Sequence, residues 1–353
     1  MGSQNKDKIS TILQHFCVAK KRYDIETINN GYINDTFMVL EKEHPLYVLQ
    51  RINHSVFGNI NGIMANINNA LLRLNDAQYE KIELIKTIDN QAYYENEDGF
   101  WRLMSYINQT TTYNTTQDAN IAFEAGRIIG KFHQLMEGAH QEDYIDTIPY
   151  FHNLELREKQ FRLAKANADI THLEVANEAL LFAEKILAEL KVLNQAELPV
   201  RICHNDTKLN NILFSTGTDK ALCLIDLDTI MKGYFYYDFG DAVRTVVNTA
   251  LEDEKELHKI TFEKKLFEAF VDGLASNGSL LSQEEIDSLP LGAVFMPFIH
   301  GLRALTDFLN NNIYYKVTYE NQNYDRCLSL FDFTQKAMNE LDYMQKVVSG
   351  KLN

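Results

Sequence analysis

The sequence lacks the features that identify several classes of protein. Its four cysteines are scattered and contain no C-x-x-C pair; they are Cys17, Cys203, Cys223 and Cys327. This spacing argues against a zinc site and a disulfide framework, so we expect reduced thiols in a cytoplasmic protein. No apolar segment at the start has the form of a signal peptide, and the uninterrupted apolar runs are shorter than a membrane span. We therefore expect no membrane partner.

Basic charge is also scarce. The 353 residues include 34 Lys and Arg against 49 Asp and Glu, which gives a formal net charge of −15. A nucleic-acid partner needs a basic face to meet the phosphate backbone, so this balance argues against one. A nucleotide is still compatible with it, because a few local cations and a metal ion suffice to bind one. No feature indicates the oligomeric state, and a monomer is the simplest expectation.

The first part of the chain has the periodicity of a small β-rich lobe. Residues 23–42 predict two strands with a turn near 29–31, and residues 45–53 predict a third strand. Apolar residues at helical spacing predict a helix over 61–74, and residues 92–107 predict a hairpin. We expect residues 1–107 to form a five-stranded antiparallel sheet with one helix.

The remainder, residues 108–353, has a predominantly helical pattern. The segment 120–139 is a strongly amphipathic helix, and helical periodicity returns from residue 239 to the end. Between them, residues 198–230 are rich in strand-forming residues. The whole chain is thus expected to belong to the α+β class, with a small β-rich lobe followed by a larger, mostly helical lobe.

A polar motif lies between two predicted short strands of this β-rich insert. The segment HNDTKLNN, residues 204–211, fits the spacing H-x-D-x-x-x-x-N. In phosphoryl transfer, one loop can present an aspartate to the acceptor hydroxyl and an asparagine to Mg²⁺, which makes Asp206 a candidate base and Asn211 a candidate ligand. Lys208 is a candidate for neutralising the transferred phosphate. The alternative is an Asx-rich turn with no catalytic role.

Two aspartates compete for the role of second metal ligand. Asp226 ends the apolar run ALCLI and follows Asp206 by twenty residues, as expected for a carboxylate delivered by a buried strand. Asp238 belongs to a DFG triplet but follows a run of aromatic residues and begins a predicted helix. We assign the metal to Asp226 and predict that Asp238 is a helix N-cap or first-turn acid. Asp228 could reach the metal, face a substrate, or be a solvated strand end.

Residues that could bind a nucleotide lie in the small lobe. Arg51, on a predicted strand, is the candidate cation for the phosphates, with a solvated arginine as the alternative. The turn before the second strand contains Asn34 and Thr36 as further candidates but only one glycine, so a glycine-rich phosphate cradle is not supported. A hinge that holds an adenine by its backbone is predicted where the lobe ends. Its candidate residues are Met104, Ser105, Tyr106 and Ile107, of which Met104 could equally be core.

Together these motifs make the chain resemble the aminoglycoside phosphotransferase/choline kinase-like superfamily, the small-molecule relatives of protein kinases. The resemblance covers nearly the whole chain and includes AGRIIGKFHQL, HNDTKLNN and LIDLDT. Within the superfamily the chain is most similar to the N-acetylhexosamine 1-kinases, through NGYINDTF, YVLQRIN, CHNDTKLNNILF, IDLDTIMKG, YDFGDAVRT and GLRALTDFLNNNIYYKV. This resemblance implies a two-lobed protein-kinase-like fold and transfer of the ATP γ-phosphate to the anomeric hydroxyl of N-acetylglucosamine or N-acetylgalactosamine.

The resemblance also assigns roles to residues of this sequence. It implies that Asp206 is the catalytic base, that Asn211 and Asp226 hold Mg²⁺, and that Arg51 replaces the usual phosphate-binding lysine. The residues expected to lie near the sugar are Tyr32, Asn34, Asp228, Asp241 and Arg303. For Asp241, an intrahelical pair with Arg244 is the alternative.

The sequence departs from the family pattern in two places. Tyr32 stands where histidine is expected, and no acidic residue lies between Arg51 and Leu74 to partner the phosphate cation. Asn66 or Asn69 could hold Arg51 instead, or the guanidinium could be held by its own planar geometry.

Other functions stay open at this point. A pocket for another hydroxyl acceptor, such as choline, homoserine or an aminoglycoside, would be lined by carboxylates or aromatic rings that face a cation. The cluster at 234–237 has four aromatic rings. Loop packing is the simpler role for that cluster. A pseudokinase that binds without turnover is the alternative from another class. His133 and His204 are expected to be structural residues.

Overall fold

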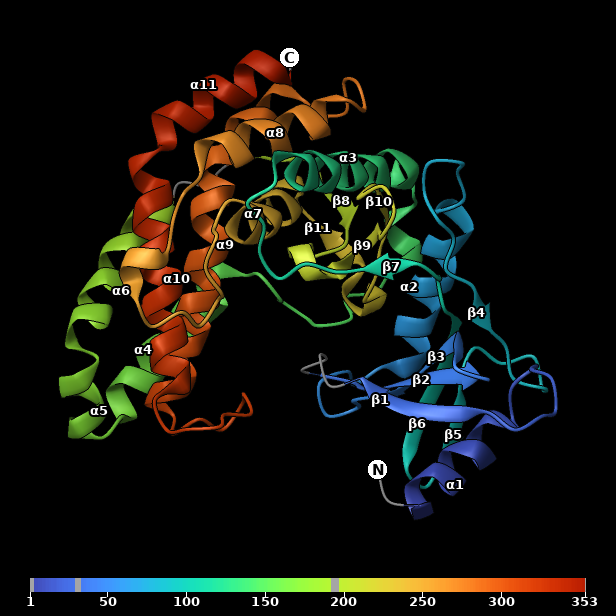
Figure 1. Ribbon diagram of the computed structural model, residues 1–353. Helices are drawn as coiled ribbons and strands as arrows, with labels where there is room; N and C mark the ends of the chain where they lie inside the picture. The colour runs from blue at the N-terminus through green and yellow to red at the C-terminus, as the bar shows by residue number, and fades with distance from the viewer. Residues whose placement is uncertain (1–2, 29–32, 192–196, 353) are drawn as a thin grey trace.

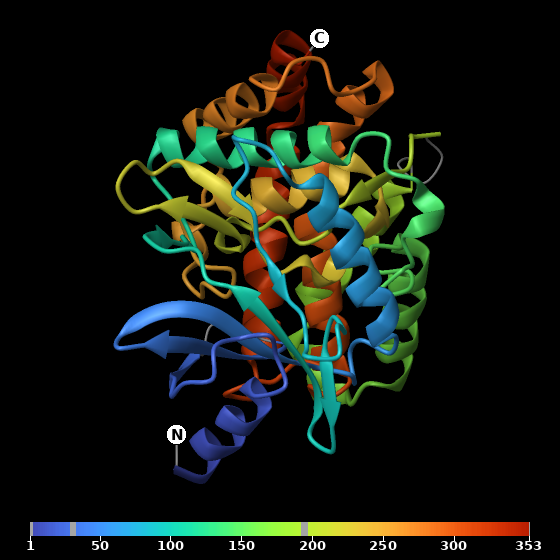
Figure 2. The ribbon, with the colours of Figure 1, turned by 90° about the vertical axis from the view of Figure 1, so that its right-hand side faces the viewer.

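The computed structural model describes residues 3–28, 33–191 and 197–352 (Figure 1). A β-rich part at the N-terminal end lies beside a larger helical part in Figure 1, and lies in front of and below most of it in Figure 2. The predicted α+β arrangement is therefore confirmed. The turn expected at 29–31 and the candidate Tyr32 lie outside the described residues.

An antiparallel sheet of six strands forms the core of the small lobe, one strand more than the five expected. The strand order is β1-β2-β3-β6-β4, with β5 also paired to β6. The extra strand, β4, has two residues and is too short to be read from a pattern of alternation. The strands are β1 (Asp24–Ile28), β2 (Asp35–Glu41), β3 (His44–Ile52), β4 (Leu84–Ile85), β5 (Tyr94–Asn96) and β6 (Gly99–Ser105).

The two faces of this sheet have different neighbours. Helix α1 (Ser3–Leu13), which the sequence pattern did not predict, shares an apolar cluster with Leu49, Trp101 and Leu103. Since side chains alternate along a strand, Gln50 and Arg102, which are opposite each other in the register, share the other face. That face looks toward α2 (Ile60–Arg73), which confirms the predicted helix, and toward the helical lobe.

The chain passes between the lobes just after β6. Residues 106–109 connect β6 to β7 (Thr110–Thr111), which pairs with β9 (Ile212–Ser215) of the larger lobe. The predicted β-rich insert is confirmed as two small antiparallel pairings, β9 with β10 (Ala221–Leu224) and β8 (Arg201–Cys203) with β11 (Met231–Gly233). These short strands lie beneath α3 and carry the loops of the candidate site (Figure 1).

Helices make up the rest of the larger lobe. They are α3 (Ala119–Met136), α4 (Leu154–Asn167), α5 (Ile170–Val175), α6 (Asn177–Leu190), α7 (Phe235–Val246), α8 (Lys264–Ala275), α9 (Gln283–Leu309), α10 (Gln322–Asn339) and α11 (Leu341–Lys351). In the described ranges one helix, α9, is long and apolar enough to cross a membrane, but 83% of its most apolar window is buried inside the protein. It therefore serves as a central core helix here. The four cysteines are free thiols, as predicted.

Helices α3 and α8 approach each other at paired glycines. An added Cβ at Gly126 would lie 1.9 Å from the carbonyl oxygen of Phe270, and one at Gly273 would lie 1.8 Å from that of Phe123. The two backbones are thus in direct contact, and neither glycine can accept a side chain without moving a helix. Helix α3 also packs on β10, so its contact with α8 fixes the position of α3 over the candidate site.

We expect Gly126→Ala to lower the free energy of unfolding by about 1–3 kcal/mol, as overpacking of a rigid contact does. The control is Gly350→Ala in α11, where an added Cβ has no atom within 4 Å. That substitution should be neutral or stabilise by about 0.5–1 kcal/mol. Denaturant melts of both variants measure the difference. Equal effects of the two substitutions would contradict the close packing of α3 on α8.

Candidate active site

The loop that follows β8 gathers three of the predicted catalytic side chains. The Asn211 Nδ2 donates to the carbonyl oxygen of Asp206 at 2.8 Å and to its Oδ2 at 2.7 Å. The Lys208 Nζ lies 3.0 Å from the same Oδ2. Among the described residues, no hydrogen bond engages the Asn211 side-chain oxygen or the Asp206 Oδ1, so these two oxygens are available to a cation and to an acceptor, respectively.

Asp238, the aspartate of the DFG triplet, holds this loop from below. It lies buried in the first turn of α7, and its carboxylate accepts the N–H of His204 at 2.8 Å and of Asn205 at 2.7 Å. Asn205 has φ of 63°, a left-handed conformation that costs free energy unless the surroundings enforce it. The first-turn placement of Asp238 is confirmed; the N-cap of α7 is Tyr234.

Two histidines brace the same region, as expected of structural residues. His204 bridges the two candidate loops: its Nε2 lies 2.9 Å from the carbonyl oxygen of Ile225, and its Nδ1 lies 3.3 Å from the N–H of Asp206. His133, from α3, is buried with its Nε2 2.8 Å from Asp238. The hydrogen bonds of His133 and His204 therefore connect α3, the loop of Asp206 and the end of β10.

Asp226 follows β10 in a left-handed conformation, with φ of 61°. The preceding residue, Ile225, donates its N–H to the carbonyl oxygen of Asn211 at 2.8 Å, which joins the two loops. Burial and the negative charges of Asp228 and Asp206 raise the pKa of the Asp226 carboxyl to about 6. Partly buried carboxylates that repel one another, together with an amide oxygen, fit the oxygen ligands that Mg²⁺ prefers.

The charge on Lys208 depends on the same carboxylates. Burial acts to lower the pKa of its amine, but Asp206 and Asp226 outweigh burial and raise that pKa. Lys208 is therefore a cation held among carboxylates, at the place where the sequence motif predicts a neutralising charge for a phosphate.

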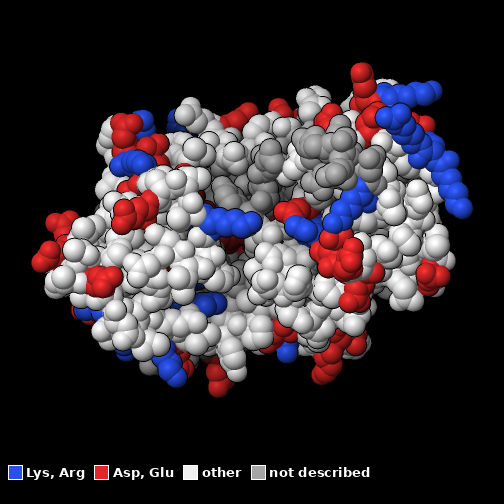
Figure 3. Space-filling view, turned by 90° about the horizontal axis from the view of Figure 1, so that it is seen from below, with Lys and Arg blue, Asp and Glu red and all other residues white. Residues whose placement is uncertain are grey.

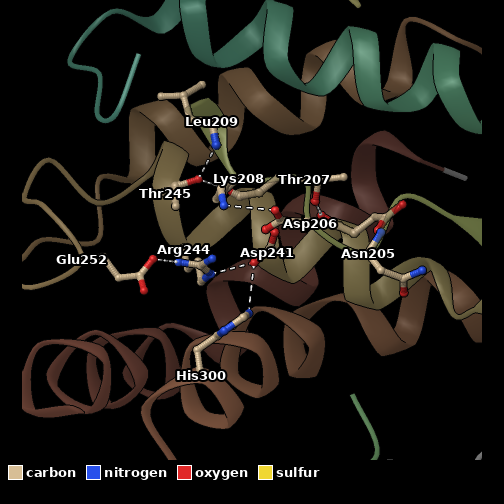
Figure 4. A network of polar contacts seen from close by, with 12 residues as sticks. Asn205, Asp206, Thr207, Lys208, Leu209, Asp241, Arg244, Thr245, Glu252 and His300 are labelled. Atoms are coloured by element: carbon tan, nitrogen blue, oxygen red, sulfur yellow. Dashed lines mark hydrogen bonds and ion pairs between the residues drawn. The ribbon is translucent and has the colours of Figure 1, made fainter. Parts of the chain in front are cut away.

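Asp241 lies in α7 beside this loop (Figure 4). Its Oδ1 accepts a hydrogen bond from Arg244 Nε at 2.7 Å and lies 3.4 Å from His300 Nε2. Burial opposes its ionisation, but Arg244 and His300 hold the pKa of the Asp241 carboxyl well below its usual range. The predicted intrahelical pair is thus present. The other carboxylate oxygen, Oδ2, is buried without a hydrogen-bond partner in the part of the chain described.

The structure does not bring Arg51 to this cluster. Arg51 shares the sheet face with Trp101, beneath α1, and its guanidinium pairs with Asp35 of β2 near the surface. The acidic partner absent from the helix is therefore on the neighbouring strand. Of the two alternatives, the one in which Asn66 or Asn69 holds Arg51 is not seen in the described residues: Arg51 pairs with Asp35, and both asparagines bond to the backbone of the helical lobe.

The cation on the face toward the helical lobe is Arg102, which the sequence reasoning missed. Its guanidinium binds both carboxylate oxygens of Asp228, and Asn34 donates to Asp228 Oδ2 at 2.7 Å. Both oxygens of Asp228 thus accept hydrogen bonds from within the protein, and the residue is almost fully buried. A signal was present in the sequence, since an arginine inside the apolar strand FWRLMS needs a buried partner.

Of the residues predicted for the adenine and phosphates, Thr36 and Met104 lie on the same sheet face as Gln50, whereas Arg51 lies on the opposite face. Gln50 Nε2 donates to Thr36 Oγ1 at 3.1 Å, and Met104 is half-buried against the large core cluster. The amides of Ser105 and Tyr106 are occupied by Glu83 and Leu46, respectively. Within the described ranges, no hydrogen bond occupies the N–H of Ile107, which is therefore the hinge donor left for a ligand.

A cavity of about 470 Å³ lies between α4, α9 and the loops at 148–149 and 313–315. Arg303, predicted to lie near a substrate, lines it and stands 5.2 Å from the Phe151 ring. No carboxylate or hydrogen-bond acceptor of the described residues pairs with this guanidinium. Arg157 lines the same cavity with its Nε buried and unpartnered, and burial together with Arg303 lowers its pKa to about 10.

The segment just before α4 is bonded to the loop of Asp206. His152, next to Phe151, has its Nε2 3.1 Å from the carbonyl oxygen of Asn205, the residue before Asp206. Burial lowers the pKa of His152 to about 3, so its ring is neutral at physiological pH. Seen from below, the surface between the two lobes is hollowed, with charged side chains of both signs at its edge (Figure 3).

The sequence also matches a model of a known protein family. The description of that family is "Phosphotransferase enzyme family", and the match runs over residues 24–260, well over half of the chain. The chain belongs to this family. The match spans the sheet, the hinge, the catalytic loop and α7. The protein is accordingly a small-molecule kinase-like phosphotransferase.

Solved structures with the same fold include kinases for different acceptors. A microcompartment-associated aminopropanol kinase is 16% identical with a TM-score of 0.65, over 96% of this chain and 98% of that chain. A choline kinase from Cryptosporidium parvum is 15% identical with a TM-score of 0.63, over 98% and 99%. An amicoumacin kinase, solved with AMP-PNP and Ca²⁺, is 14% identical with a TM-score of 0.59, over 96% and 94%. At these identities the likeness shows the protein-kinase-like fold and leaves the acceptor open.

The different roles of Asp226 and Asp238 can be tested by ligand-induced stabilisation. At Mg²⁺·ADP about 100-fold above its Kd, the wild type should gain about 2.7 kcal/mol of stability by linkage. We expect Asp226→Asn to lose most of this gain, because it removes a charged ligand. Asp238→Asn should lower the melting temperature without ligand yet keep a gain on adding Mg²⁺·ADP. Thermal melts with and without Mg²⁺ measure both, and the reverse pattern would assign the metal to the DFG aspartate.

Proposed function

We propose that this phosphotransferase transfers the γ-phosphate of ATP to the anomeric hydroxyl of an N-acetylhexosamine, N-acetylglucosamine or N-acetylgalactosamine. The observation that supports the kinase chemistry is the convergence of Asp206, Lys208, Asn211 and Asp226 from two loops joined by backbone and side-chain bonds. Support for the sugar comes from the resemblance of the chain to N-acetylhexosamine 1-kinases and from the charge of the acceptor cavity.

The proposed reaction asks the protein mainly to align and neutralise its substrates. The acceptor oxygen attacks the γ-phosphorus, the bond from that phosphorus to the bridging oxygen breaks, and ADP leaves with the bond electrons. The acceptor proton passes to Asp206, whose Oδ2 is fixed by Asn211 and Lys208 and whose Oδ1 faces the acceptor. Lys208 neutralises the charge on the transferred group. An anomeric hydroxyl is more acidic than other sugar hydroxyls, so an ordinary carboxylate suffices as its base.

Asp226 and Asn211 are the residues that would hold Mg²⁺. When bound, the ion would supply positive charge to the phosphates of the nucleotide. The raised pKa of Asp226, which reflects crowding of carboxylates, supports this assignment because a cation would relieve the repulsion. Ile107 would donate its free N–H to the adenine, with Met104 against the ring and Thr36 near the phosphates.

The charge of the acceptor cavity favours a neutral acceptor over an amine. Two arginines, Arg303 and Arg157, line the cavity against one carboxylate, that of Asp307, which is buried and accepts the N–H groups of Tyr314 and Tyr315. A choline, aminopropanol or aminoglycoside acceptor would bring a further cation against these arginines. A sugar can accept hydrogen bonds from a guanidinium without that repulsion.

The aromatic cluster at 234–237 also gives little support to a quaternary ammonium. Its rings pack against one another and against Phe295, with the Tyr236 and Tyr237 ring centroids 4.6 Å apart. Tyr236 is almost fully buried. The cluster is therefore a packing element, as the simpler expectation had it, and its ring faces are not open to the cavity.

We expect the wild type to release ADP when given N-acetylglucosamine or N-acetylgalactosamine, but not choline, homoserine or kanamycin. Product NMR should place the phosphate on the anomeric oxygen. Asp206→Asn should lower kcat by at least ~10²-fold, a typical contribution of a positioned base. The control Asp146→Asn removes an exposed carboxylate of the same lobe and should leave kcat unchanged.

Two other outcomes of this assay would change the assignment. ADP release with an amine acceptor alone would place the protein among the other small-molecule kinases. Binding of nucleotide with no ADP release for any acceptor would favour a non-catalytic binding module. Near-full activity of Asp206→Asn would remove Asp206 as the base.

Arg303→Gln tests the acceptor cavity. The loss of a charged hydrogen-bond donor should raise the KM for the sugar by roughly tenfold, about 1.4 kcal/mol, and leave the KM for ATP unchanged. Arg162→Gln is the matched control, because Arg162 points outward from α4 and pairs with Glu158 at the surface. A rise in the KM for ATP, or no rise for the sugar, would show that Arg303 does not contact the acceptor.

A further inference from the structure

An ion pair between Arg102 and Asp228 crosses from the small lobe to the helical lobe. Both residues are only 1% exposed. The pair is bidentate: Arg102 Nη1 donates to Asp228 Oδ1, and Nη2 donates to Oδ2 at 2.9 Å. A buried ion pair is costly to form unless its geometry is good and its remaining polar atoms are bonded, and both conditions hold here.

Neighbouring side chains complete the hydrogen bonding of this pair. Gln50, opposite Arg102 in the sheet, accepts from the guanidinium Nε at 2.9 Å and from Nη2 at 2.7 Å. Asn34 donates to Asp228 at 2.7 Å and accepts the N–H of Asn53 at 3.0 Å. The cluster of Arg102, Asp228, Gln50 and Asn34 therefore joins β6, β3 and the start of β2 to the loop after β10.

The two ends of this cluster lie next to the segments that would face a nucleotide. Asp228 stands two residues after Asp226, in the short 3-10 helix η4 (Leu227–Thr229). Asn34 directly precedes β2, where the sequence places the turn over the phosphates. The carboxylate of Asp228 thus connects the loop that contains Asp226 to Asn34, at the end of the turn predicted to cover the phosphates.

We propose that Arg102 is a positioning residue for nucleotide binding, acting through Asp228 to hold Asp226 and the segment at Asn34 in register across the two lobes. The inference rests on the proposed function in taking Mg²⁺·ATP as the ligand. Arg102 does not itself touch the nucleotide, because its donors are directed at Asp228 and Gln50. The pair of Arg102 with Asp228 links the two lobes, whereas the pair of Arg51 with Asp35 stays inside the small lobe.

The chain contains a matched control for this proposal. Arg51 is the neighbour of Gln50 in β3 and pairs with Asp35, but on the opposite sheet face and at the surface, with 44% and 47% of the two side chains exposed. The same substitution at Arg51 therefore removes an arginine–aspartate pair of the same sheet without touching the lobe junction.

The affinity for Mg²⁺·AMP-PNP, measured by calorimetry, tests the proposal without requiring turnover. We expect Arg102→Gln to weaken it by about 10- to 100-fold, the usual effect of removing a residue that orients a metal ligand. Arg102→Lys should recover part of the loss by keeping the charge. Arg51→Gln should stay within about twofold of the wild type, because an exposed pair contributes little.

A double variant separates positioning from stability. Arg102→Gln alone leaves Asp228 buried and unpaired, so its melting temperature should fall; Arg102→Gln with Asp228→Asn should regain stability but not nucleotide affinity. If the double variant recovers both, or if Arg51→Gln weakens binding as much as Arg102→Gln, the proposal is overturned.

A wild type that binds Mg²⁺·AMP-PNP without ADP release would refute only the proposed catalysis. A wild type that does not bind it refutes both.

Discussion

The hydrogen bonds from the catalytic loop to the buried carboxylate of Asp238 are the constraint on which the site depends. Two successive amides, those of His204 and Asn205, point into the protein at a place where water cannot satisfy them, and a single carboxylate of α7 accepts both. This forces Asn205 into a left-handed turn and directs the side chain of Asp206 outward beside Lys208 and Asn211. The packing of α7 on α9 thus decides where the candidate base stands.

A second constraint relates the two lobes. Because side chains alternate along β3 and β6, only one of the two arginines at the middle of the sheet can face the helical lobe, and it is Arg102. Its charge is balanced by Asp228 from the loop after β10, so the sheet and the candidate metal loop meet through one fully bonded ion pair. The link between the two lobes is therefore carried by β6, the strand next to that of Arg51.

The acceptor side is less constrained by the fold. Solved structures with this fold include kinases named for aminopropanol, choline and amicoumacin, so the fold by itself does not select an acceptor. In this chain the cavity beside α4 and α9 has two arginines without carboxylate partners among the described residues. Electrostatics then argues against amines, and the neutral sugar suggested by the resemblance is consistent with that charge.

The β-rich and helical parts, the candidate loop HNDTKLNN and the first-turn position of Asp238 could be predicted from the sequence, because these depend on local periodicity and on spacing along one chain. The assignment of the metal to Asp226 stays a prediction. The sequence does not show which face of β3 meets the helical lobe. It therefore suggests Arg51, whereas Gln50 and Arg102 are the residues that face the helical lobe. The sequence also leaves several possible roles for Asp228. Helix α1 and the two-residue β4 have no strong local pattern and are held by packing. Arg102 and Asp228 are 126 residues apart in the sequence, and only the tertiary structure brings them together. The alternation of side chains along a strand assigns each residue to one of two sheet faces, but long-range packing decides which part of the protein each face contacts.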